Sequence, residues 1–452
     1  MSEPQTMVAL DNEPAIERET MRKVSLRLLP FLFVLYVFNF IDRSNVALAA
    51  LQMNRDLSFS SSAFGFGAGI FFIGYALFEV PSNLILARIG ARRWIARIMI
   101  SWGILAAAMM LIRTPVQFYI VRFLLGVAEA GFLPGVVFYL TKWFPTNRRA
   151  RAQSRFFIAL PASGIVGGFL GGYLLGLDGV RGLAGWQWLF LLEGLPSIVI
   201  GFVVLWYLTD EPKDARWLSE EQRTWLASRM ALDRATDGPL HTMSALDALK
   251  LPVVWVLTIP YFLMLTAAYG YTFWVPTVIR DTLHTTNSQT GLITAAIATV
   301  SMAVMLLVAA SSDRRNERFY HAGLGGLLIT AGFTGAALLP MPIMRIVFLG
   351  MVIIGCNALL SPFWCLPSRI LGGEAAAVGI ALVNSIGNIG GFIGPYAIGF
   401  LKDATGSNNG SFLGLAACGV GVTLFCISLR GSVLGHSTDK SIPRTTREVL
   451  VT

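Results

Sequence analysis

The chain has 452 residues, of which 55% are hydrophobic and only 13% are charged, and its formal net charge is +9. A mean hydropathy of +0.64 excludes a soluble globular protein of this length and indicates a protein of the lipid bilayer. The excess of basic residues fits contact with an anionic membrane surface, and nothing in it calls for nucleic acid.

In chain order, about a dozen apolar stretches are long enough to cross a bilayer as helices. They lie at 28–50, 63–86, 95–112, 116–140, 153–176, 186–208, 251–279, 289–311, 320–340, 343–366, 376–401 and 411–430. This number predicts an all-α polytopic membrane protein with 12 transmembrane helices.

Two of these stretches carry an arginine and a carboxylate deep in their interior. Measured from Leu28, Asp42 and its neighbour Arg43 lie about 20 Å along a helix that must cross roughly 30 Å of hydrocarbon. Charges at that depth cost about 2.5 kcal/mol or more, so they usually pair, face a cavity and mark a substrate or ion path. Arg122 and Glu129 share a helix face in the fourth stretch but lie about 10 Å apart, too far for an easy direct pair. We expect Asp42 to pair with one arginine and a cargo carboxylate to pair with the other, which indicates an anionic cargo.

A polar linker at 209–250 divides the chain into two halves with six stretches each. Within it, the sequence LSEE at 218–221 predicts a capped surface helix. Glycine bands recur in the fifth and eleventh stretches, so we expect two pseudo-symmetric six-helix bundles that rock about a midplane site. The predicted segments are a tail at 1–27, bundles at 28–208 and 251–430 around the linker, and a tail at 431–452.

Most of the 35 lysines and arginines fall in the two tails, the linker and alternate loops. By the positive-inside rule, this asymmetry places both termini in the cytoplasm. Residues 1–27 do not resemble a signal peptide, because they are polar and of mixed charge. We expect a multi-pass protein of a bacterial inner membrane that functions as a monomer.

The order of the stretches, the long linker and the inner-loop sequence PSNLILARIGARR at 81–93 resemble the major facilitator superfamily. Three further segments resemble its anion:cation symporter branch, and they are FIDRSN at 40–45, GYALFEVPSN at 74–83 and RFLLGVAEAG at 122–131. The resemblance covers roughly 28–430. It implies proton-driven uptake of an organic anion, with Asp42 and Glu129 as proton-coupling residues.

Arginine forks and neutral hydrogen-bonding or aromatic side chains are the expected cargo contacts. These candidates are Arg43, Arg122, Tyr75, Ser163, Tyr271, Trp274, Ser361, Trp364, Asn384 and Asn388. Helix packing, or a structural ion-pair cluster for the charged residues, is the alternative for each. Expected gate residues near the inner ends of the second and eighth stretches are Glu79, Asn83, Arg88, Arg92, Asp313 and Arg314.

Several cargo classes stay open. The fifth stretch lacks the glutamine associated with sugar-acid members, which favours a hydroxy-dicarboxylate such as tartrate or a hydroxyaromatic carboxylate. A sugar-acid/proton symporter is the alternative. A drug/proton antiporter is disfavoured because the Gly-Pro signature is missing from the fifth stretch.

A membrane-embedded enzyme or sensor is a different class of function. The sequence shows no nucleophile-base set, metal-ligand spacing or phosphate loop, so we expect no enzymatic activity, catalytic residue, cofactor or metal.

Overall fold

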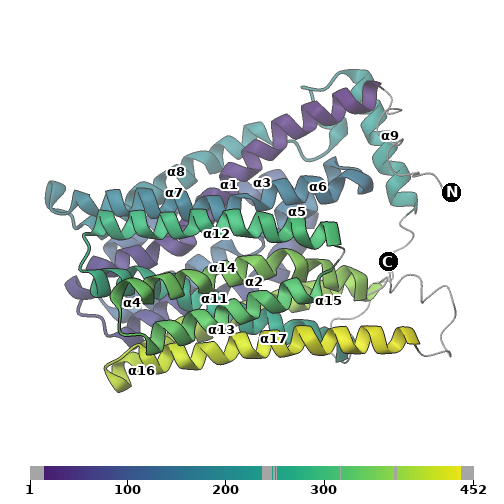
Figure 1. The fold of residues 1–452 in the computed structure, drawn as a ribbon. Helices are drawn as coiled ribbons and strands as arrows, with labels where there is room; N and C mark the ends of the chain where they lie inside the picture. Colours follow the sequence, from purple (N-terminus) through teal and green to yellow (C-terminus); the bar gives the residue numbers. More distant parts are fainter. Residues whose placement is uncertain are drawn as a thin grey trace.

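All regular structure is helical in the computed structural model, which describes residues 15–236, 247, 250, 252–315, 317–370 and 374–438 (Figure 1). Among these residues, eleven helical stretches are long and apolar enough to span a membrane. The remaining predicted span, at 376–401, is divided between α15 (Glu374–Asn388) and α16 (Gly390–Thr405). The prediction of an all-α polytopic protein is confirmed.

The amino-terminal bundle contains the helices that precede the linker. They are α1 (Ala15–Asp56), α2 (Ser61–Ile89), α3 (Ala91–Ala108), α4 (Pro115–Glu129), α5 (Phe132–Trp143), α6 (Thr146–Phe157), α7 (Ala159–Leu174) and α8 (Gly185–Tyr207). Because α1 begins at Ala15, it extends about 20 Å beyond the predicted start at residue 28. The predicted tail at 1–27 is therefore helical from Ala15 onward.

The carboxy-terminal bundle contains the helices that follow the linker. They are α11 (Pro252–Leu283), α12 (Asn287–Arg315), α13 (Phe319–Leu338), α14 (Pro342–Ile370), α15, α16 and α17 (Asn409–Thr438). Within the linker, α9 (Glu220–Thr236) is the predicted surface helix. Its start is a capping box, since the backbone N–H groups of Ser219 and Gln222 each donate to the other residue's side chain. Helix α9 packs against α1 and α5.

Three spans are broken helices, and one break follows a charged residue directly. Between α4 and α5, Gly131 has a φ of +83°, a conformation that disfavours any residue with a Cβ. A Cβ at Gly131 would also meet the Oγ of Ser82 on α2. The fourth predicted stretch therefore changes direction just after Glu129, which fixes where that carboxylate lies.

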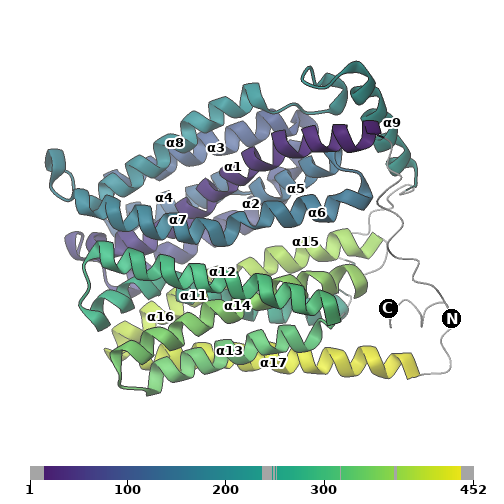
Figure 2. The same cartoon turned by 45° about the horizontal axis from the view of Figure 1, so that its top comes forward.

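The most extensive contacts between the two bundles join α2 with α16 and α7 with α12, and Figure 2 shows the bundles one above the other. Glycines let these backbones approach closely. A Cβ at Gly65 would lie 2.5 Å from the carbonyl oxygen of Pro395, and one at Gly168 would lie 2.9 Å from that of Gly291. The glycine band of the fifth predicted stretch, which contains Gly168, thus forms part of the interface between the bundles.

The two ends of the molecule differ in their contacts. We call the end that carries α9 and the start of α1 the linker end, and the opposite end the distal end. At the distal end, the carboxylate of Asp403 on α16 accepts hydrogen bonds from the backbone N–H groups of Ser61 and Ser62 at the start of α2, 3.1 and 2.7 Å away. The close glycine contacts lie in the same half, so the bundles are joined there.

Candidate transport site

Two buried guanidinium groups share one aromatic ring in the amino-terminal bundle. The Cζ of Arg43 on α1 lies 5.1 Å from the centre of the Phe71 ring, and that of Arg122 on α4 lies 4.9 Å from it. Arg43 also stacks on Tyr75, whose ring centre is 4.9 Å away. Both rings belong to α2, so three helices bring the two predicted cargo arginines and Tyr75 together.

Arg43 has a protein carboxylate as its partner. Its Nη2 lies 2.9 Å from the Oε2 of Glu129, and both side chains are buried. The amide of Asn39, one helical turn before Arg43, donates to the same oxygen at 2.9 Å. This arrangement corrects the expectation that Asp42 pairs with an arginine. Glu129 fills that role because the break at Gly131 ends α4 beside α1.

Arg122 has no such partner. Its side chain is fully buried, and its Nη2 donates to the backbone carbonyl oxygen of Ala68 at 3.2 Å. Among the described residues, no carboxylate oxygen lies within 4 Å of its guanidinium, and its Nε makes no hydrogen bond. An arginine in a low-dielectric interior favours a nearby anion, so this side chain is suited to bind a carboxylate from outside the chain.

Asp42 is linked to a second buried carboxyl group through Asn45. The amide nitrogen of Asn45 lies 2.7 Å from the Oε2 of Glu193 on α8 and 3.4 Å from the Oδ1 of Asp42. The Oδ2 of Asp42 and the Oε1 of Glu193 are buried without a protein donor. The amide of Asn45 therefore links two buried carboxyl groups that come from different helices.

The carboxyl group of Glu79 connects the two bundles. On α15, the amide of Asn384 donates to its Oε1 at 2.8 Å and the hydroxyl of Ser385 donates to its Oε2 at 2.9 Å. The hydroxyl of Tyr261 on α11 lies 3.4 Å from the amide oxygen of Asn384. Glu79, which was predicted as a gate residue, has a buried side chain that is directed toward α15.

The other predicted gate residues lie apart from this contact. Asn83 donates to the backbone carbonyl of Glu79 within its own helix. Arg92 contacts Asp210 through its backbone N–H at 2.8 Å. Arg88 and Arg314 are exposed at the ends of α2 and α12, and the side chain of Asp313 lies outside the described residues.

The remaining predicted cargo residues are scattered. Trp274 donates to the carbonyl of Pro395 and has Lys402 over its ring, toward the distal end. Ser163 donates to the backbone of its own helix at 2.6 Å, and Asn388 does the same at 3.0 Å. Tyr271 is buried in α11, whereas the side chain of Ser361 lies outside the described residues. Trp364 packs on Tyr261, 5.0 Å between ring centres.

Four participants are absent from the predicted site: Asn39 and Asn45 on α1, Glu193 on α8, and Ser385 on α15. Glu193 lies about 12 Å along α8 from its first residue, Gly185. The sequence could have indicated the two asparagines. Asn39 and Asn45 lie three or four residues from Asp42 or Arg43 in an apolar stretch, a spacing that places them on the same helix face.

With this geometry in place, comparison with known proteins decides the family. The Major Facilitator Superfamily profile matches residues 32–395. This chain belongs to that superfamily. It is therefore a multi-pass membrane transporter. A protein of Agrobacterium vitis, provisionally named a tartrate transporter, is 43% identical over 427 residues, which cover 94% of each chain.

Two further likenesses bear on function and fold. A quinolone resistance transporter of Acinetobacter baumannii is 39% identical over 391 residues, covering 86% of this chain and 90% of that one. The crystal structure of a bacterial homologue of the human lysosomal transporter Spinster superposes with a TM-score of 0.70 at 18% identity. That match covers 90% of this chain and 95% of the other, and it supports the two-bundle fold alone.

Proposed function

We propose that this transporter imports a small organic anion together with protons by alternating access. The cargo class is a hydroxy-dicarboxylate such as tartrate, or a hydroxyaromatic carboxylate. The observation that carries the proposal is the fully buried guanidinium of Arg122, which has no carboxylate within 4 Å among the described residues. A cargo carboxylate can accept two parallel N–H···O bonds from the donors that Arg122 leaves unused.

Coupling to protons follows from the charges around Arg122. Two guanidinium groups face three buried carboxyl groups, those of Asp42, Glu129 and Glu193. Because a lone buried charge is costly, an added anion is best accommodated when carboxyl groups take up protons. Protonation of Glu129 weakens its bond to Arg43, so Arg43 becomes available to the cargo as a second cation. Asp42 and Glu193 hold a further proton between them.

The alternating step is assigned to the contacts between the bundles. The distal end is joined by Asp403 and the close glycine contacts, while Glu79 joins α2 to α15 on the linker side. Import requires these two sets of contacts to break in turn. With both termini in the cytoplasm of a bacterial cell, the distal end faces outward and the Glu79 contact is the inner gate.

One relative supports a second candidate function. The likeness to a quinolone resistance transporter favours proton-driven export of an aromatic drug. Quinolones carry a carboxylate, so loss of binding in an Arg122 variant fits both functions. The direction of coupling separates them, because a symporter accumulates cargo on the alkaline side of a membrane and an antiporter accumulates it on the acidic side.

Uptake into proteoliposomes is the test of the proposed function. Tartrate, a hydroxybenzoate, a sugar acid and a quinolone are offered separately, each with the interior alkaline, acidic or equal in pH to the outside. We expect one of the first two compounds to accumulate only in vesicles with an alkaline interior. Accumulation of a sugar acid alone assigns the other symporter class. Accumulation of the quinolone only in acidic vesicles contradicts the proposal and establishes the antiporter.

A further inference from the structure

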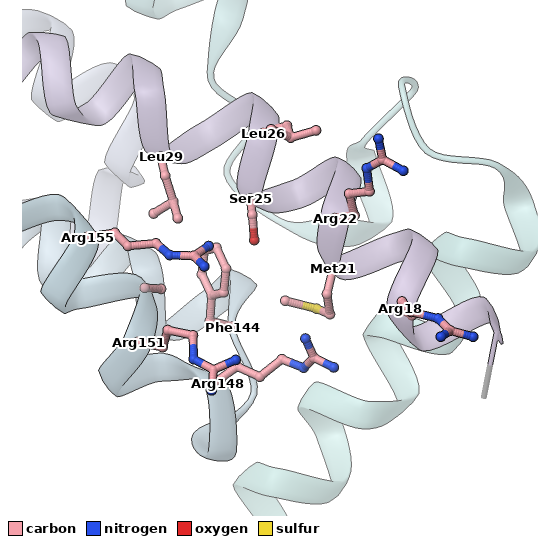
Figure 3. A pocket seen from close by; sticks show the side chains of 11 residues that line it. Arg18, Met21, Arg22, Ser25, Leu26, Leu29, Phe144, Arg148, Arg151 and Arg155 are labelled. Carbon is pink, nitrogen blue, oxygen red and sulfur yellow. The ribbon is translucent and has the colours of Figure 1, made fainter. Parts of the chain in front are cut away.

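A strongly basic cavity lies at the linker end, away from the transport site. It has a volume of about 410 Å³ and lies between α1 and α6 (Figure 3). Its lining includes five arginines and no acidic side chain, and the arginines are Arg18, Arg22, Arg148, Arg151 and Arg155. Along α1, the lining residue Leu29 is about 21 Å from Arg43, so this cavity is distinct from the central charges.

Helical spacing places the arginines on two stripes, one on each helix. Arg18 and Arg22 are four residues apart on α1, and Arg148, Arg151 and Arg155 follow an i, i+3, i+7 spacing on α6. Figure 3 shows the α6 arginines extending toward the α1 segment. Arg148 lies 3.5 Å from Glu17, whereas the other four arginines form no ion pair with any described residue. Like charges on both walls repel, so an anion between them stabilises this arrangement.

The rest of the lining is apolar, which narrows the kind of anion. Besides Ser25, the other lining residues are Met21, Leu26, Leu29, Phe144 and Ala152. Leu26 is 65% exposed, and two further exposed apolar residues, Phe157 and Ile158, follow Arg155. Charged and exposed apolar groups side by side suit a molecule with an anionic head and a hydrocarbon tail. A soluble phosphate uses the arginines but leaves the apolar surface in water.

We propose that this cavity binds the phosphate headgroup of an anionic phospholipid. The arginine forks of α6 and α1 hold the phosphate oxygens from two sides, and the acyl chains lie along the exposed apolar residues. The cavity volume falls in the roughly 300–1,000 Å³ range of small-molecule sites, and basic pockets at the cytoplasmic face of membrane proteins recognise such headgroups. The bound lipid clamps the extended start of α1 to α6.

The test compares two triple variants that remove the same charge. R22Q/R151Q/R155Q empties the cavity of three cations, and R93Q/R216Q/R315Q removes three exposed arginines elsewhere. Purified, delipidated proteins are titrated with phosphatidylglycerol, phosphatidylcholine or sodium phosphate, and binding is followed by native mass spectrometry and by the thermal unfolding midpoint. We expect the unmodified protein and the control to prefer phosphatidylglycerol, and the cavity variant to bind it at least tenfold more weakly.

The cavity variant should remain folded, because removing like charges removes repulsion. Its thermal unfolding midpoint without lipid should be equal to or higher than that of the unmodified protein. If the triple variant is poorly folded, Arg151→Gln alone should still weaken phosphatidylglycerol binding at least threefold. Three results overturn the proposal: equal affinity for phosphatidylcholine, an equal loss in the control, or saturation by sodium phosphate with no added effect of lipid. The last result assigns the cavity to a soluble phosphate.

Discussion

Replacing Arg122 with lysine should lose cargo binding although the positive charge is kept. The guanidinium uses one of its N–H donors on the carbonyl of Ala68 at 3.2 Å, which leaves a pair for the two oxygens of a carboxylate. An ammonium group cannot reproduce this planar fork, so at least one charge-assisted hydrogen bond is lost. Such a bond contributes about 1.5–3 kcal/mol, which corresponds to roughly a 10- to 150-fold increase in Kd.

Isothermal titration of the purified protein with the cargo found in the uptake screen measures this change. The matched control is Arg97→Lys, because Arg97 is a half-buried arginine on α3 that stacks on Trp94 at 3.9 Å. The control should alter Kd less than twofold. If Arg122→Lys binds as tightly as the unmodified protein, the two-bond recognition of a carboxylate is refuted. If the control loses as much affinity, the effect is a general one of arginine packing.

Three further predictions concern the coupling and packing of the bundles. Asn384→Ala should weaken binding of a hydroxylated cargo and of its deoxy analogue by equal factors, because the amide of Asn384 donates to Glu79 at 2.8 Å and does not bind a cargo hydroxyl. If titration shows a loss for the hydroxylated cargo alone, Asn384 contacts the cargo after all. Asp403→Asn should weaken the distal contact with Ser61 and Ser62, so spin labels on the distal ends of α2 and α16 should show a population at longer distance. The control variant Asp281→Asn should leave the distance distribution unchanged. Gly131→Ala should lower stability by about 2 kcal/mol because of its positive φ and the nearby Ser82, while Gly176→Ala, which meets open space, should leave the thermal midpoint unchanged.

The fold followed from the sequence because lipid imposes few alternatives. A dozen apolar stretches, a polar linker and repeated glycine bands are enough to predict two helical bundles. The breaks within spans were harder to foresee. At Gly131, the positive φ and the close approach of α2 depend on tertiary packing, which local sequence does not specify. A glycine within an apolar stretch is also compatible with an unbroken helix.

The site was predictable in its residue types but not in its pairings. The depth of Asp42, Arg43, Arg122 and Glu129 could be read along each helix, because depth depends only on the rise per residue. Pairing depends on how different helices are rotated against each other. The sequence therefore could not reveal that Arg43 contacts Glu129, nor that the amide of Asn45 reaches Glu193 on α8.

Glu79 is a further example of a contact between distant segments. Its place near the inner end of the second predicted stretch, close in sequence to Arg88 and Arg92 of the inner loop, indicated a gate residue but not its partners. In the folded chain, the carboxyl group faces away from that loop and accepts hydrogen bonds from Asn384 and Ser385, more than 300 residues later. The spacing of residues along one helix does not reveal which residues of the other bundle they contact.

Proton coupling is tested most directly by separating net uptake from exchange. Asp42→Asn and Glu129→Gln are each reconstituted into proteoliposomes, and accumulation of labelled cargo under an inward proton gradient is compared with exchange against internal cargo at equal pH. The account predicts that each variant loses accumulation while exchange survives, because exchange need not return an empty carrier. Accumulation by both variants at the unmodified level would contradict the assignment of the proton sites. Accumulation that depends on sodium and not on pH would contradict proton coupling itself.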